Sequence, residues 1–187
     1  MGNAADQRQA QPSMNRFDQR SRSLTPFLAL TACAVLFLWM TCRGLPDVVA
    51  SHFDVSGQAN GFMSRGFYFA LMLIIVAIAP LALAVLPISM FNKPGARINL
   101  PNGHYWLAPE RRADTIDFLS RQSTRFAAMT LVFLCYTHWL VVRANAVVPP
   151  HLSSPWFLGG LVVFLLGTLV WVISLLGHFR HVPHEAA

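Results

Sequence analysis

The chain has little charge and few cysteines. Charged residues make up 12 % of its 187 positions, about half of the roughly 25 % found in soluble domains. The three cysteines form no Cys-x-x-Cys pair, which excludes a disulfide framework or a zinc knuckle. The low charge also excludes intrinsic disorder for most of the chain. Hydrophobic residues reach 55 %, too many for a core of this size to bury, so the sequence predicts an integral membrane protein.

Enzyme motifs are absent as well. The sequence contains no Gly-x-Ser-x-Gly elbow, no His-Glu-x-x-His zinc helix and no cluster of carboxylates. Its net charge of +6 comes from scattered basic residues, whereas nucleic-acid binding needs a compact basic surface. We therefore expect a non-enzymatic protein that binds no nucleic acid, holds no metal ion and needs no cofactor.

Four apolar stretches are long enough to cross a bilayer. Each has at least 19 residues, and a helix needs about 20 to cross the roughly 30 Å hydrocarbon layer. Within lipid the backbone must satisfy its own hydrogen bonds, so these stretches are predicted to be helices. The predicted fold is an all-α integral membrane protein with four transmembrane helices, at Leu24–Cys42, Gly66–Phe91, Phe126–Val148 and Pro155–Gly177.

The basic residues predict the orientation of these helices. Most lysines and arginines lie in segments 1–23, 92–125 and 178–187, and an excess of positive charge stays on the cytoplasmic side. We therefore expect a multi-pass protein with both termini in the cytoplasm. The loops 43–65 and 149–154 then lie outside.

This orientation divides the chain into five regions. The polar segment 1–23 is predicted to be a disordered cytoplasmic N-terminus. A two-helix unit with the outer loop 43–65 follows, then a cytoplasmic loop and helix, a second pair of transmembrane helices and a cytoplasmic tail. The last four regions span residues 24–91, 92–125, 126–177 and 178–187.

The outer loop has the pattern of a small folded unit. Within residues 51–55, Ser51, Phe53 and Val55 alternate with His52 and Asp54. This period of two is typical of a short extended segment. The dipeptides Ser56-Gly57 and Asn60-Gly61 favour turns. The candidate binding residues of this loop are Asp47, His52, Phe53, Asp54 and Gly57. Three roles stay open for His52 and its neighbouring carboxylates: support of the turn, contact with a ligand or partner, and metal ligation, against which the irregular spacing of these residues argues.

The order of motifs in this loop resembles a known family. The motifs are Leu45-Pro46-Asp47, His52-Phe53-Asp54, Ser56-Gly57-Gln58 and Asn60-Gly61-Phe62-Met63-Ser64-Arg65. They are similar to a bacterial membrane domain of unknown function that forms the N-terminal part of SdpI-type immunity and signalling proteins. The resemblance covers about residues 25–75, and no second, C-terminal module of those proteins is recognised. It implies a protein of the bacterial inner membrane with an SdpI-like two-helix unit that senses, binds or confers immunity to a peptide through its outer loop.

The cytoplasmic loop carries a second set of candidates. Pro109 is suited to the first position of a helix, and Glu110 complements the positive end of the helix dipole. We expect an interfacial amphipathic helix from about Pro109 to Arg125, which lies along the inner leaflet and then turns upward into the third span. Either membrane anchoring or docking of a cytoplasmic partner explains the polar and aromatic residues here, namely Tyr105, Trp106, Glu110, Arg111 and Arg112.

Two ionisable residues lie within the third predicted span. Arg143 is near its outer end, where a long side chain reaches the interface. His138 is near its middle, where ionisable groups are costly and often functional. A neutral His138 bonded to Thr31, Tyr136 or a backbone carbonyl is one interpretation, and a proton relay or substrate contact is the other.

Two functions follow from these candidates. The first is a non-enzymatic membrane protein that senses, binds or protects through its outer loop, with the lipid bilayer and a peptide or another membrane protein as partners. The alternative is a small accessory subunit of a membrane transport or redox complex that uses His138.

Overall fold

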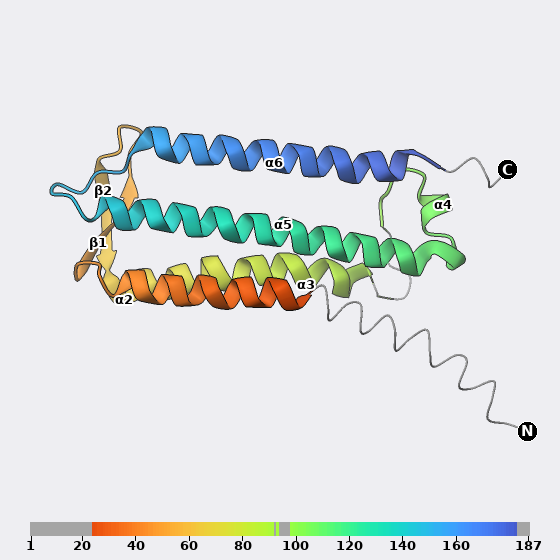
Figure 1. Cartoon of the computed structure of the whole chain (residues 1–187), viewed down its shortest axis with the longest axis horizontal. Coiled ribbons are helices and arrows are strands. Elements are labelled where there is room, and N and C mark those ends of the chain that lie inside the picture. The colour runs from red at the N-terminus through yellow and green to blue at the C-terminus, as the bar shows by residue number, and fades with distance from the viewer. Residues whose placement is uncertain (1–23, 92, 94–97, 183–187) are drawn as a thin grey trace, which may run out of the picture.

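The computed structural model describes residues 24–91, 93 and 98–182. Four long helices lie side by side, and consecutive helices run in opposite directions (Figure 1). They confirm the predicted four helices that are long and apolar enough to cross a membrane. The predicted disordered segment 1–23 and residues 183–187 of the tail lie outside the described residues. The helices are Leu24–Cys42, Arg65–Phe91 (built from α2, η1 and α3), α5 (Pro109–Ala144) and α6 (Ser154–Arg180).

The second long helix consists of three segments. α2 (Arg65–Leu73) passes into a π-helical segment, η1 (Ile74–Ile78), and then into α3 (Ala79–Phe91). Pro80 explains the change, because proline has no N–H to donate and its ring crowds the carbonyl four residues earlier. A π-turn gives that carbonyl more room. The helix therefore continues past Pro80 instead of ending there.

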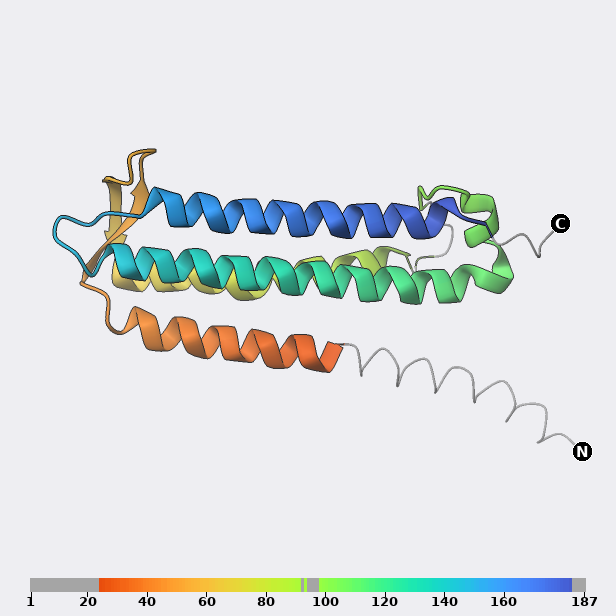
Figure 2. The same ribbon diagram turned by 45° about the horizontal axis from the view of Figure 1, so that its top comes forward.

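α5 is longer than any single predicted element. It has 36 residues, which corresponds to about 54 Å of helix, and no proline or glycine follows Pro109 within it. The expected interfacial helix 109–125 and the third span are therefore one unbroken helix, and the expected turn between them is not present (Figure 2). Because about 30 Å suffices to cross the hydrocarbon layer, part of α5 extends beyond it.

A hairpin at one end of the bundle makes the fold not purely α-helical. Strands β1 (Val48–Phe53) and β2 (Ala59–Ser64) pair antiparallel, with Val49 opposite Met63. The alternation in this loop predicts an extended segment, and pairing of two such segments produces the sheet. Val49 and Ala50 are fully buried, so the hairpin packs onto the bundle and does not extend away from it.

Two apolar clusters hold the helices together. One lies at the hairpin end and contains Leu38, Cys42, Leu45, Val49 and Tyr68. The other lies further along the helices and includes the small residues Ala34, Ala84 and Ala127. In lipid, small residues at helix contacts let backbones approach closely, and the resulting van der Waals contacts drive association. α5 contacts α3 more extensively than it contacts α6.

Gly57 joins the hairpin turn to the connection between α5 and α6. Its φ is +87°, a conformation that costs residues with a Cβ about 1–2 kcal/mol. Its carbonyl accepts a hydrogen bond from the Leu152 N–H at 2.8 Å. A Cβ at this position would overlap the Leu152 carbonyl and contact the ring of His151.

Replacement of Gly57 by alanine is expected to destabilise the protein by more than about 1 kcal/mol, because the conformational cost and the overlap with Leu152 add together. Thermal unfolding of the detergent-solubilised protein measures the effect. Gly66→Ala is the matched control, because a Cβ there meets nothing within 4 Å. Equal melting temperatures for the two variants would contradict the assigned role of Gly57.

Candidate functional site

The hairpin end of the molecule is formed by two segments that bind each other. We call residues 48–64 and 145–153 together the cap. The Leu152 N–H donates to Gly57, the Ser154 hydroxyl donates to the Val55 carbonyl at 3.2 Å, and Gln58 forms a bridge with His151. The turn of the hairpin and the α5–α6 connection are therefore one hydrogen-bonded unit (Figure 1).

Asn145 attaches this unit to α5. Its Oδ1 accepts from the Ala50 N–H at 2.8 Å, and its Nδ2 donates to the Ala50 carbonyl at 2.9 Å. The side-chain amide thus pairs with β1 as the backbone of another strand would. Nδ2 also donates to the Val141 carbonyl at 2.9 Å. The sequence analysis did not identify Asn145 as a candidate. The signal that could have identified it is its polar amide, which directly follows an apolar helix.

Two of the candidate binding residues support the hairpin turn. Asp54 Oδ1 accepts hydrogen bonds from the Ser56 hydroxyl at 2.7 Å, the Ser56 N–H at 2.9 Å and the Gln58 N–H at 3.0 Å. The bond from the Ser56 side chain, followed by the backbone bond from Gln58, lowers the pKa of Asp54. With the glycine conformation of Gly57, these contacts account for the turn-supporting role that the sequence left open.

The other candidates of this loop lie apart. Asp47 is exposed and forms an ion pair with Arg65 at 2.9 Å. His52 is exposed on β1, with its Nδ1 3.0 Å from the Ser51 hydroxyl, and Phe53 is half-buried at the end of β1. Among the described residues, no three His, Cys, Asp or Glu side chains gather closely enough to hold a metal ion.

Three helices meet at His138. Its ring is 1 % exposed, its Nε2 lies 2.7 Å from the Thr41 hydroxyl, and its Nδ1 lies 2.9 Å from the Tyr68 hydroxyl. Phe37 packs edge-on against the ring at 5.7 Å between centroids. The expected partners, Thr31 and Tyr136, are therefore wrong: the Thr31 hydroxyl donates to Phe27 and the Tyr136 hydroxyl to Trp156. α5 ends at Ala144, which places His138 in its last two turns rather than at mid-span.

The hydrogen bonds around His138 are consistent with one arrangement of protons. The Thr41 hydroxyl has one proton and lies 2.7 Å from the Phe37 carbonyl, to which it donates. Its oxygen then accepts from Nε2–H of His138, and Nδ1 accepts from the Tyr68 hydroxyl. This assignment gives a neutral imidazole with both ring nitrogens satisfied, as a buried polar group requires.

A double-mutant cycle tests this network. Tyr68→Phe leaves Nδ1 of His138 without a donor and is expected to cost about 1 kcal/mol of unfolding free energy. Tyr68→Phe combined with His138→Leu should cost less than the sum of the single changes, with a coupling of about 0.6 to 1.7 kcal/mol. Reversible unfolding in mixed micelles supplies the free energies.

Thr31→Val provides the control, because that hydroxyl donates to the Phe27 carbonyl of its own helix. Its effect should add to that of His138→Leu without coupling. Additive effects for Tyr68→Phe as well would show that the hydrogen bond to His138 contributes nothing to stability.

The candidates at the opposite end mostly make contacts within the chain. α4 (Gly103–Trp106) brings Trp106 to the end of α6, where its Nε1 donates to the Phe179 carbonyl at 3.0 Å. The Arg111 guanidinium lies 3.9 Å from the centre of the Tyr105 ring, and Arg112 donates to the Phe91 carbonyl at 3.3 Å. Of the five candidates, Glu110 is the most open to a partner, since it is exposed in the first turn of α5.

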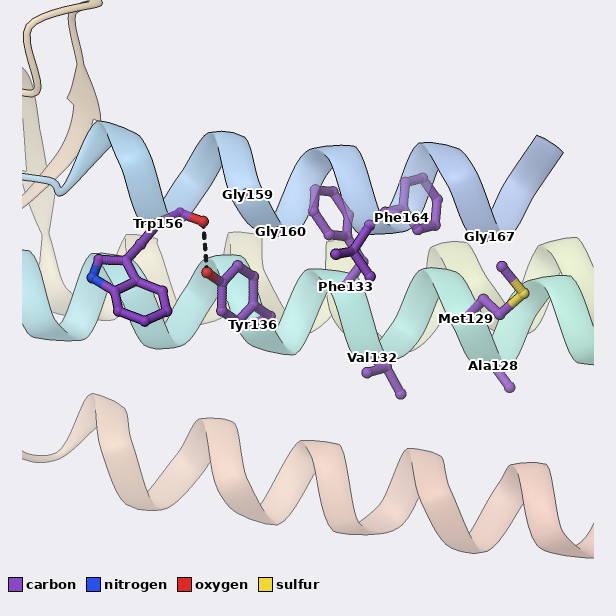
Figure 3. Close-up of a pocket in the computed structure, with 11 residues that line it drawn as sticks. Ala128, Met129, Val132, Phe133, Tyr136, Trp156, Gly159, Gly160, Phe164 and Gly167 are labelled. Carbon is purple, nitrogen blue, oxygen red and sulfur yellow. Dashed lines mark hydrogen bonds between the residues drawn. The ribbon is translucent and has the colours of Figure 1, made fainter. Parts of the chain in front are cut away.

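An apolar groove runs between α5 and α6 on the side of the bundle. It has a volume of about 850 Å³, and the glycines Gly159, Gly160 and Gly167 of α6 line it together with apolar side chains of both helices (Figure 3). The Tyr136 hydroxyl donates to the Trp156 carbonyl at 2.6 Å across the end of the groove that is nearer the hairpin (Figure 3). At the hairpin end of α5, Arg143 is exposed and lies over the Trp139 ring.

The helices and their connections define a multi-pass membrane protein, with a hydrogen-bonded cap at one end of the bundle. Residues 27–78 match the family model described as a domain of unknown function (DUF1648), which confirms the predicted similarity of this segment to a domain of unknown function. The matched segment comprises most of the Leu24–Cys42 helix, the hairpin, α2 and η1. No curated protein and no solved structure is detectably similar to the chain.

Proposed function

We propose that the chain is a non-enzymatic protein of the bacterial inner membrane that binds a peptide or another membrane protein through its cap. The observation that carries this proposal is the combination of a fixed backbone with exposed apolar side chains. Exposed apolar surface marks sites of protein or membrane interaction. Those of the cap are Val48, Val55, Phe62, Val147 and Val148, each about half exposed or more.

A fixed backbone favours binding, because no conformational entropy is lost in ordering the cap when a partner binds. Asn145, which pairs with β1, also donates to the Val141 carbonyl of α5, and Ser154 of α6 donates to the Val55 carbonyl, so the cap is held to the bundle at two separate places. A partner that binds such a surface does not have to order a flexible loop. The hairpin lies within the segment that matches the family, so this proposal also fits the sensing or immunity role implied by the SdpI-type resemblance.

The proposed orientation places the cap outside the cell and both termini in the cytoplasm. It is supported by the basic residues near the opposite end, among them Arg111, Arg112, Arg121 and Arg125 of α5. The cap itself contains no lysine or arginine. A partner would therefore reach the cap from the extracytoplasmic side.

A role as a transport or redox subunit through His138 has less support. A proton relay needs a group that exchanges protons with water or with a substrate. His138 is 1 % exposed, and hydroxyls of Thr41 and Tyr68 occupy both of its ring nitrogens. The contacts of His138 are those of a residue that joins helices.

Labelling of one introduced cysteine at a time in intact cells tests the orientation. A membrane-impermeant maleimide is expected to modify Ser56→Cys, in the exposed hairpin turn, and to leave Glu110→Cys unmodified until the cells are permeabilised. The wild-type chain measures the background from its three cysteines, all of which lie in helices. Labelling of Glu110→Cys in intact cells would contradict the orientation.

Site-specific photo-crosslinking in the native host tests partner binding. A benzophenone amino acid at Val55 or Phe62 should give a polypeptide adduct of defined mass under ultraviolet light, because these side chains are exposed on the cap. The same probe at Val170, exposed on α6, is the control for chance encounters in the membrane. Adducts of equal yield at Val170, or none at the cap, would refute the proposal.

A further inference from the structure

Two arginines line one pocket at the hairpin end of the bundle. The pocket has a volume of about 370 Å³ and lies between the end of the Leu24–Cys42 helix and the start of α2. Neither the cap contacts nor the His138 network uses it as a whole. Its lining residues are Trp39, Cys42, Arg43, Arg65, Gly66 and Phe69.

The pocket carries net positive charge. Arg65 is neutralised in part, since its Nη2 pairs with Asp47 at 2.9 Å and its Nη1 donates to the Leu45 carbonyl at 2.9 Å. Arg43 contacts the Trp39 ring, with its guanidinium carbon 4.4 Å from the ring centre. Among the ion pairs of the described residues, none involves Arg43. Its hydrogen-bond donors are therefore available to an anion.

An aromatic residue lies about one helical turn deeper in the bundle than each arginine. Trp39 lies on the Leu24–Cys42 helix, four residues before Arg43, which directly follows that helix. Phe69 lies on α2, four residues after Arg65. Because the two helices are antiparallel, both aromatic positions are about 6 Å deeper in the bundle than the arginines. Gly66 adds no side chain, and the space over it is open. The pocket thus has a cationic rim and an apolar floor along the membrane normal.

We propose that this pocket binds a phospholipid, with the phosphate of its headgroup at Arg43 and Arg65 and the upper part of an acyl chain along Trp39 and Phe69. Arginine donates paired hydrogen bonds to phosphate oxygens, and aromatic side chains favour the depth of the headgroups. A free phosphate ion would use the rim but not the apolar floor. The depth of the aromatic rings therefore favours a lipid.

Lipid titration of the delipidated full-length protein in detergent tests the proposal. Phosphatidylglycerol should raise the melting temperature in a saturable manner, whereas diacylglycerol with the same chains and inorganic phosphate should each raise it much less. Arg43→Gln should weaken the apparent affinity for phosphatidylglycerol by about tenfold, the equivalent of one charge-assisted hydrogen bond. Native mass spectrometry counts the bound lipid under the same conditions.

Arg143→Gln is the matched control, because Arg143 also lies over a tryptophan at the hairpin end but outside this pocket. It should keep the wild-type affinity. Gly66→Leu fills the pocket without removing a charge and should weaken binding as Arg43→Gln does, so the test does not depend on one variant. Equal affinity in Arg43→Gln and Arg143→Gln would overturn the proposal. An effect of inorganic phosphate equal to that of the lipid would also overturn it.

Discussion

Polar groups buried at the hairpin end of the bundle must find hydrogen-bond partners within the protein, and the arrangement of the helices depends on this requirement. An unpaired polar group in a lipid environment costs several kcal/mol. α5 and the residue that follows it supply the partners: His138 donates to the Thr41 hydroxyl and accepts from the Tyr68 hydroxyl, and the Asn145 amide bonds both backbone groups of Ala50. Rotation or sliding of α5 would break several of these bonds together, whereas apolar contacts alone would tolerate such a shift.

The same bonds show that the segment that matches the family model takes some of its hydrogen-bond partners from the rest of the chain. Residues 27–78 contain Thr41, Tyr68 and Ala50, whose partners all lie beyond Ile78 on or next to α5. The apolar cluster that includes Ala34 and Val76 is likewise completed by Leu131 of α5. α5 therefore completes the packing of the helix–hairpin–helix unit and fixes the position of the cap.

The two ends of the molecule are built by different means. At the hairpin end, hydrogen bonds of Asn145 and Ser154 join the cap to α5 and α6, and apolar side chains of the cap stay exposed. At the other end, an aromatic cluster covers the end of α6: Phe118 stacks on His178 with ring centres 4.0 Å apart, and Trp106 packs against Phe179. Together with the Arg111–Tyr105 and Arg112–Phe91 contacts, they engage four of the five candidate docking residues. The cap is thus the more open of the two surfaces, which is why the proposed function rests on it.

Hydropathy alone determined the four helices, because a stretch of about 20 apolar residues has one stable conformation in lipid. The alternation and turn dipeptides of the outer loop likewise predicted an extended, folded segment, since such signals are local. The partners of His138 could not be predicted in this way: Thr41 and Tyr68 lie 97 and 70 residues away, and only the packing of three helices decides which hydroxyls reach the ring. For the same reason, only the tertiary structure showed that Asn145 completes the hairpin, and that Arg43 and Arg65 share a pocket.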